Sequence, residues 1–109
     1  MIKIHIERDK ENNIVKYYVN GHANAAQHGE DIVCASISIL AQTTLLALHE
    51  LLSIEILYDM RDGWLSCVLP SLTKDLREKA NLILNTMLIG IKGTQGMYSN
   101  YIDLYDGEV

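Results

Sequence analysis

Residues 31–52 read DIVCASISILAQTTLLALHELL, a stretch without glycine or proline. Its apolar residues recur at the spacing of one helical face, namely at Ile32, Val33, Ile37, Leu40, Ala41, Leu45, Leu48 and Leu52. Other apolar residues, such as Ile39, Leu46 and Leu51, fall off this stripe, so we expect the helix to be covered on more than one side. At about 1.5 Å per residue such a helix crosses a whole small domain, and we predict that it is the central helix of the fold.

The same helix is uncharged from Ile32 to Leu48, a feature that it shares with membrane spans. A span needs about 20 predominantly apolar residues, whereas this run is shorter and contains serine, threonine and glutamine. We therefore expect a buried helix in a soluble protein that makes no contact with a membrane.

Short segments with the two-residue alternation of β-strands lie before and after this helix. IKIHIE (2–7) places three isoleucines on one face, and IVKYYVN (14–20) follows a polar turn as its predicted hairpin partner. IEILYDM (54–60) and WLSCVLP (64–70) are predicted strands on either side of a turn that contains glycine. YSNYIDLY (98–105) is predicted to be the last strand.

A second helix is predicted between the fourth strand and the last. Ser71 or Thr73 would cap its N-terminus, with Asp75 in the first turn, where a negative charge is favoured. Its apolar face consists of Leu76, Ala80, Ile83, Leu84, Met87, Leu88 and Ile91. Gly90 and Gly93 are expected to end it.

The predicted order is therefore ββαββαβ, which belongs to the α+β class: one domain over residues 1–109, a sandwich with two helices packed among small β-sheets. A chain of 109 residues has no room for two cores. Its formal net charge of −5 and its lack of a basic stripe argue against direct binding of nucleic acid.

The start of the chain and its cysteines indicate where the protein works. Residues 1–6 alternate between charged and apolar residues and lack the apolar core of a signal peptide. Without an export signal, Cys34 and Cys67 indicate a reducing cytoplasm in which thiols stay free, with a disulfide as the minor alternative. Cys67 shares a strand face with leucines and is predicted to be a core residue.

The segment GHANAAQHGEDIVCASIS (21–38) holds the residue pair best suited to catalysis, His22 and Cys34. Asp31 lies where a helix N-cap is expected, which puts Cys34 at the third helical position. Unpaired backbone N–H groups and the helix dipole favour a thiolate there, and an imidazolium at His22 would favour it further. In thiol hydrolases such a histidine takes the thiol proton and later gives it to the leaving amine.

Other interpretations of these residues stay open on spacing alone. A cysteine at the start of a buried helix is usually a small core residue, and a histidine after a strand-ending glycine is usually solvated. Asp31 can serve as a helix cap and nothing more. A zinc site is a further alternative, with His22, His28, Asp31 and Cys34 as ligands. Their intervals match no standard zinc motif, so we rank metal binding below thiol catalysis.

Several short motifs resemble the signature of a known family, the bacterial ribosomal-processing cysteine proteases called Prp. These motifs are GHA (21–23), Gly29, DIVCA (31–35), Ser38 and Leu40. The likeness extends over nearly the whole chain, from the opening IKI hairpin to the closing YSNYIDL strand. Asn24 and Ser36 stand where the family often has glycine and alanine, and neither difference removes a reacting group.

The resemblance implies a cytoplasmic homodimer without a cofactor, in which Cys34 is the nucleophile, His22 is the base and Asp31 has a supporting role. The implied substrate is the N-terminal extension of a bacterial large-subunit ribosomal protein, number twenty-seven of that set. Two other hypotheses compete with this one. The chain could be a non-catalytic ribosome-assembly or peptide-binding module, or a module stabilised by zinc.

Gly21 and Gly29 bracket a predicted loop of mostly small residues. We expect this loop to be mobile and to close over an extended peptide, which would bring His22 to Cys34. The predicted substrate-binding residues are Gly21, Ala23, Gly29, Ala35 and Ser38. Backbone N–H groups at the front of the helix, including that of Cys34, are the predicted donors to the oxyanion.

Overall fold

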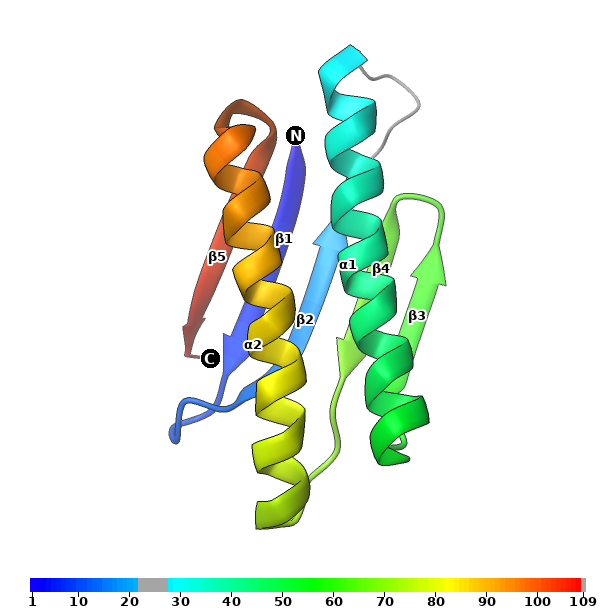
Figure 1. Ribbon diagram of the computed structural model, residues 1–109, viewed down its shortest axis with the longest axis vertical. Coiled ribbons are helices and arrows are strands. Elements are labelled where there is room, and N and C mark those ends of the chain that lie inside the picture. Colours follow the sequence, from blue (N-terminus) through cyan, green and yellow to red (C-terminus); the bar gives the residue numbers. More distant parts are fainter. Residues whose placement is uncertain (22–27, 109) are drawn as a thin grey trace.

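The computed structural model describes residues 1–21 and 28–108, and all of their side chains except those of residues 28–31. A five-stranded sheet forms one layer, and two long helices cover one face of it (Figure 1). The elements are β1 (Ile2–Arg8), β2 (Ile14–Asn20), α1 (His28–Leu52), β3 (Leu57–Arg61), β4 (Trp64–Val68), α2 (Lys74–Met97), the 3₁₀ turn η1 (Ser99–Tyr101) and β5 (Ile102–Glu108). This confirms the α+β class and the ββαββαβ order, with one mixed sheet in place of the small sheets expected.

The sheet has the strand order β3-β4-β2-β1-β5. β1 and β2 form the predicted antiparallel hairpin, and the Asp9 carboxylate holds its turn by accepting the backbone N–H groups of Glu11 and Asn13, both at 2.9 Å. β4 pairs antiparallel with both β2 and β3, whereas β5 pairs parallel with β1. Asn20 at the end of β2 is paired with Trp64 at the start of β4. The β3–β4 turn therefore lies beside the end of β2.

The core lies between the sheet and the two helices. Ile2, Ile4 and Ile6 of β1 are buried, as their alternation predicts. α1 buries the stripe Val33, Ile37, Ala41, Leu45 and Leu48, and α2 buries Ala80, Leu84, Met87, Leu88 and Ile91. Cys67 on β4 is fully buried among them, which confirms it as a core residue. Tyr17 on β2 is also buried, and its hydroxyl donates a hydrogen bond of 2.9 Å to the carbonyl of Ala41.

The outer surface of α1 is apolar. By length and composition, the part of α1 from Ile32 to Leu52 could cross a membrane. One side of it packs against the sheet, however, which is the arrangement of a core helix. α2 packs against a second side of α1, which confirms that the helix is covered on more than one side. The cover is incomplete, however, since Ile39 is 62% exposed and Leu46 is 52% exposed. α1 therefore buries one apolar face and presents another to the outside.

α2 begins where predicted but runs further than predicted. Thr73 is its N-cap, and the Thr73 hydroxyl accepts a backbone N–H from the first turn at 3.3 Å. The helix then passes through Gly90 and Gly93, so the prediction that these glycines end it is wrong. A Cβ on Gly90 would lie 3.0 Å from Cδ2 of Leu40 on α1. Gly90 thus permits the close approach of the two helices.

Two strands also start later than predicted. Ser53 adopts the left-handed φ of 54° at the end of α1, and β3 starts only at Leu57. Residues 99–101 form the 3₁₀ turn, so the last strand occupies the second half of the predicted segment and continues to Glu108.

The outer face of the sheet carries a row of stacked rings. His5 on β1 stacks on Tyr18 of β2 at a centroid distance of 4.8 Å and on Tyr105 of β5 at 4.5 Å, and Tyr18 stacks in turn on Trp64 of β4 at 5.0 Å. Cross-strand aromatic pairs of this kind stabilise a sheet. The row fixes Trp64, and with it the first residue after the β3–β4 turn.

Candidate active site

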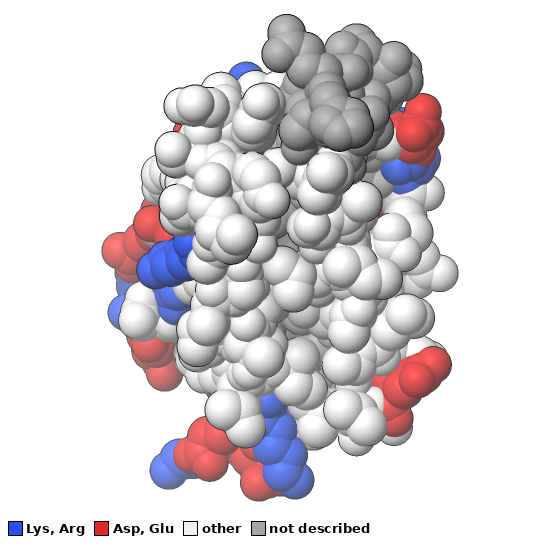
Figure 2. Space-filling model, turned by 45° about the horizontal axis from the view of Figure 1, so that its top comes forward, with Lys and Arg blue, Asp and Glu red and all other residues white. Residues whose placement is uncertain are grey.

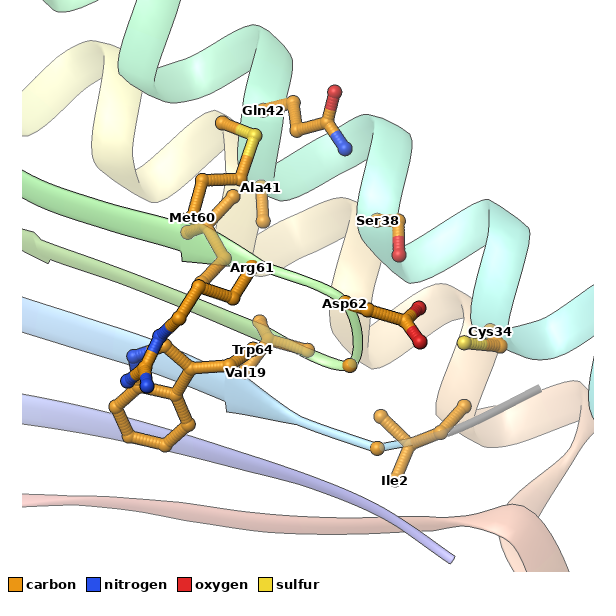
Figure 3. A pocket seen from close by; sticks show the side chains of 13 residues that line it. Ile2, Val19, Cys34, Ser38, Ala41, Gln42, Met60, Arg61, Asp62 and Trp64 are labelled. Atoms are coloured by element: carbon orange, nitrogen blue, oxygen red, sulfur yellow. The ribbon is translucent and has the colours of Figure 1, made fainter. Parts of the chain in front are cut away.

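A pocket of about 230 Å³ lies between α1, the end of β2 and the β3–β4 turn (Figure 3). From α1 it is lined by Cys34, Ser38, Ala41 and Gln42, from β2 by Val19 and the adjoining Gly21, and from the β3–β4 hairpin by residues 60–65. The α1 residues are three or four positions apart, apart from the adjacent pair Ala41 and Gln42, which places them along one side of the helix. The pocket is thus built where helix, strand end and turn meet.

Cys34 is the thiol in this pocket. Its side chain is partly exposed, forms no disulfide and points its sulfur into the pocket (Figure 3). Cys67 differs from Cys34 in its exposure, because Cys67 is fully buried and burial raises the pKa of its thiol to about 11. Of the two cysteines, only Cys34 is placed to meet a molecule from solution.

The predicted start of the helix is wrong, and this changes the surroundings of Cys34. α1 begins at His28, because Gly29 and Glu30 adopt helical conformation before Asp31. Asp31 is therefore not the N-cap, and Cys34 lies in the second helical turn and not at the third position. The unpaired N–H groups of a helix are its first four, and the helix dipole acts mainly within its first turn.

The observed start of α1 makes two further predictions wrong. The N–H of Cys34 lies beyond the first four residues of α1 and is committed to the helix, so it is not the oxyanion donor predicted for it. The four N–H groups that have no partner within the helix at this end are those of residues 28–31. Gly29 is the second residue of α1 and does not end a loop.

Gly21 lines the pocket, as predicted, and its neighbours explain the glycine. Its N–H donates a hydrogen bond of 2.9 Å to the carbonyl of Gly63 in the β3–β4 turn. A Cβ on Gly21 would lie 3.0 Å from Cγ1 and 3.1 Å from the backbone Cα of Ile2. The residue is therefore a point of close contact between β1, β2 and the turn.

The remaining predicted site residues divide into three groups. Ser38 lines the pocket one turn after Cys34, and Figure 3 shows its hydroxyl on the same side. Ala35 is exposed on α1 and does not line the pocket. His22 and Ala23, together with the expected loop, lie outside the described residues, and so do the side chains of His28 and Asp31.

The zinc alternative depends mostly on the same undescribed side chains. Among the side chains that the structure describes, no group of three or more histidine, cysteine, aspartate or glutamate residues could hold a metal ion. Of the four ligands considered, only Cys34 belongs to that set. The described part of the pocket offers sulfur, hydroxyl, amide and carboxylate groups, which suit a peptide as well as an ion.

The β3–β4 turn contributes a residue that the sequence did not indicate as functional, Asp62. Figure 3 shows its carboxylate directed toward the space beside Cys34. Its neighbour Arg61 is paired with Asp59 at 2.8 Å, and its side chain runs along Trp64, away from Asp62 (Figure 3). The only signal in the sequence was the Asp-Gly turn, which predicts a hairpin but not its distance from Cys34.

Nearly the whole chain matches a protease family in sequence and in structure. The family model described as cysteine protease Prp matches residues 1–103. The ribosomal processing cysteine protease Prp of Bacillus subtilis (strain 168) is 30% identical over 103 residues, which is 92% of this chain and 92% of that protein.

Solved structures give the same result. The essential ribosomal processing protease Prp from S. aureus in complex with a substrate peptide is similar with a TM-score of 0.86 at 26% identity, covering 97% of this chain and 99% of that one. The same protease with a covalently linked product peptide matches with a TM-score of 0.82 at 28% identity, covering 98% and 99%. Fold, length and motifs agree, and the chain belongs to the cysteine protease Prp family, the ribosomal processing proteases.

Proposed function

We propose that this protease removes the N-terminal extension of large-subunit ribosomal protein twenty-seven, with Cys34 as the nucleophile and His22 as the general base. The observation that carries the proposal is the Cys34 thiol, which is unbridged, partly exposed and directed into a pocket that opens to the surface. GHA and DIVCA, the motifs that resemble the family signature, supply the histidine and the cysteine, and both lie within the residues that the family model matches. Cys67 is sealed in the core and offers no alternative nucleophile.

The pocket suits a segment of extended peptide. Its volume of about 230 Å³ is smaller than the roughly 300–1,000 Å³ of sites that enclose a whole small ligand. It has room for one or two side chains, while the rest of a peptide would lie across the surface. The solved S. aureus relative with a substrate peptide supports a polypeptide as the ligand.

In the proposed reaction, His22 takes the proton from Sγ of Cys34, and the sulfur attacks the carbonyl carbon of the scissile bond. The tetrahedral intermediate collapses, the C–N bond breaks, and the new amine leaves with the proton from His22. The N-terminal fragment stays on Cys34 as a thioester. Water, deprotonated by His22, then releases it as a carboxylate and restores the thiol. The S. aureus relative with a covalently linked product peptide supports a covalent step of this kind.

Asp31 has a supporting role in this proposal. Its backbone lies in the first turn of α1, ahead of Cys34. An Asp31→Asn variant removes the charge while keeping the size and polarity of the side chain. We expect a fall in kcat for this variant if the carboxylate assists His22, and an unchanged kcat if Asp31 only favours the start of the helix.

We also propose that the protein is a cytoplasmic homodimer that forms through the outer face of the helices. Figure 2 shows no Lys, Arg, Asp or Glu over the middle of the face that it draws. On α1, Ile39 and Leu46 are exposed, and on α2, Leu82 and Ile89 are exposed. An uncharged apolar surface of this kind is unusual on a monomer and suits a second, identical copy. A reducing cytoplasm would keep Cys34 as the thiol that the reaction needs.

The test is incubation of the protein with a synthetic peptide that spans the N-terminal extension and the start of the mature ribosomal protein. Mass spectrometry should detect two fragments with wild type and none with Cys34→Ala. Cys67→Ala is the matched control, because it removes the other thiol and should still cleave. Cleavage by Cys34→Ala would contradict the nucleophile, and peptide binding without cleavage by wild type would indicate a peptide-binding module instead.

A further inference from the structure

We propose that Asp62 makes this protease select a cationic side chain, lysine or arginine, in the peptide next to the bond that Cys34 attacks. The inference rests on the proposed function of the same pocket and adds a specificity-determining residue to it. Its basis is the position of one carboxylate beside the nucleophile, on a turn that the sheet holds in place.

The Asp62 carboxylate is available to a ligand. It lines the pocket and points toward the space next to the Cys34 sulfur (Figure 3). Among the described residues no hydrogen bond or ion pair joins it to another side chain, and its neighbour Arg61 is bound to Asp59 at 2.8 Å. The neighbouring guanidinium is thus paired with another carboxylate, and a charge-assisted contact with Asp62 is open to a cation of the substrate.

The turn that carries Asp62 is fixed at three points. Arg61 and Trp64 are cross-strand partners at the ends of β3 and β4, and Trp64 is held in the aromatic row on the outer face. Gly63 adopts a φ of 74°, which a tight turn of this kind requires and glycine accepts without strain. The Gly63 carbonyl accepts the N–H of Gly21 at 2.9 Å. The backbone of Asp62 is therefore preorganised, and binding a cation costs little ordering of the turn.

Among the described residues that line the pocket, no other gives a basis for selecting charge. On α1 the polar lining residues are Ser38 and Gln42, which are neutral. Arg61 also lines the pocket, but its guanidinium lies on the Trp64 side and is already paired (Figure 3). A positive side chain of the substrate thus meets a single unpaired negative group, and a negative one meets repulsion.

The size of the effect follows from the exposure of Asp62. Because the turn is open to solvent, a salt bridge there is partly screened. We expect a preference of about three- to tenfold in kcat/KM for lysine over an uncharged side chain of the same length, which is the range of a charge-assisted contact at a solvent-accessible site. The preference should shrink as salt is added.

The experiment uses a series of extension peptides in which each position around the scissile bond is in turn lysine, norleucine or glutamate. At one position, wild type should cleave the lysine peptide about three- to tenfold better than the norleucine peptide, mainly through a lower KM. Asp62→Asn should lose this preference, so that its kcat/KM values for the lysine and norleucine peptides become nearly equal. Asp62→Lys should reverse it and favour glutamate.

The matched control is Asp103→Asn on β5, at the far edge of the sheet, which removes the same charge from the protein and should keep the preference. A preference that survives in Asp62→Asn, or one that Asp103→Asn abolishes equally, would overturn the assignment to Asp62. If wild type cleaves lysine and norleucine peptides equally well, this inference fails while the proposed function stands. If wild type cleaves no peptide, including the natural one, the proposed function itself fails.

Discussion

The backbone N–H of Gly21 donates a hydrogen bond of 2.9 Å to the carbonyl oxygen of Gly63. Gly21 is the last described residue before the segment that carries His22, and Gly63 follows Asp62 in the β3–β4 turn. One contact therefore connects the chain that leads to the proposed base with the turn that faces the proposed nucleophile. A substitution at either glycine should therefore change the structure on both sides of the pocket.

Gly21→Ala is the most direct test of that relationship. A Cβ at this position would lie 3.0 Å from Cγ1 and 3.1 Å from Cα of Ile2, and the Cα, being backbone, cannot rotate away. Either β1 or the contact with Gly63 must shift, so we expect a loss of about 1–3 kcal/mol in the free energy of unfolding. Urea unfolding followed by the fluorescence of the single tryptophan measures it, and a value equal to that of wild type would show that the strands have room to adjust.

Gly93→Ala should have the opposite effect. Gly93 lies within α2, and a Cβ there would meet nothing within 4 Å. Alanine is the better helix former, so we expect the free energy of unfolding to rise by about 0.5–1 kcal/mol. The same unfolding assay applies. Gly90→Ala is the companion variant. Its Cβ would lie 3.0 Å from the Leu40 side chain, so its free energy of unfolding should rise less than that of Gly93→Ala.

These two glycines also show what a sequence can and cannot predict about this fold. The alternation in β1 and the spacing in α1 predict their elements well, because a half-buried strand and a helix on a sheet each expose one side to water. The same reasoning failed at Gly90, since a glycine at a helix end and a glycine at a helix–helix contact look alike in sequence. The start of α1 was missed because nothing apolar or periodic marks residues 28–30.

The site was predictable to the extent that it is local. Cys34 and Ser38 lie one turn apart on one helix, so their common side follows from spacing. Asp62 could not be found in this way, because it reaches the pocket only through the pairing of β4 with β2. That pairing joins segments on either side of α1 and has no signature in either segment alone.

Stability should decline above pH 9, and Cys67 provides the reason. Burial raises its pKa from 9.0 to about 11. Below pH 9 the thiol is protonated in both folded and unfolded chains, so its titration does not affect stability. From pH 9 upward the unfolded chain loses the proton first, and the free energy of unfolding falls by about 2 kcal/mol by pH 11. Burial raises the pKa of Tyr17 as well, which adds to the loss above pH 10.

Urea unfolding at a series of pH values measures this decline, and Cys67→Ala separates the two groups. The variant has a small cavity in place of the sulfur and should be less stable than wild type at every pH. The quantity to compare is therefore the slope of the free energy of unfolding against pH. Between pH 9 and pH 10 its stability should stay nearly level while that of wild type falls. Equal slopes in the two proteins would assign the decline to Tyr17 and not to Cys67.

Ile39→Glu tests the proposed dimer surface. Ile39 is 62% exposed and lines the groove between α1 and α2, so a charge there should change the stability of a single subunit by no more than about 0.5 kcal/mol. In a dimer formed through this face, however, the carboxylate would be buried without a partner, and we expect the variant to sediment as a monomer while wild type sediments as a dimer. Leu57→Glu is the matched control, since Leu57 is 74% exposed and lies on the edge strand β3. We expect this variant to remain a dimer. The reverse result, a monomer from Leu57→Glu and a dimer from Ile39→Glu, would move the interface to the edge of the sheet.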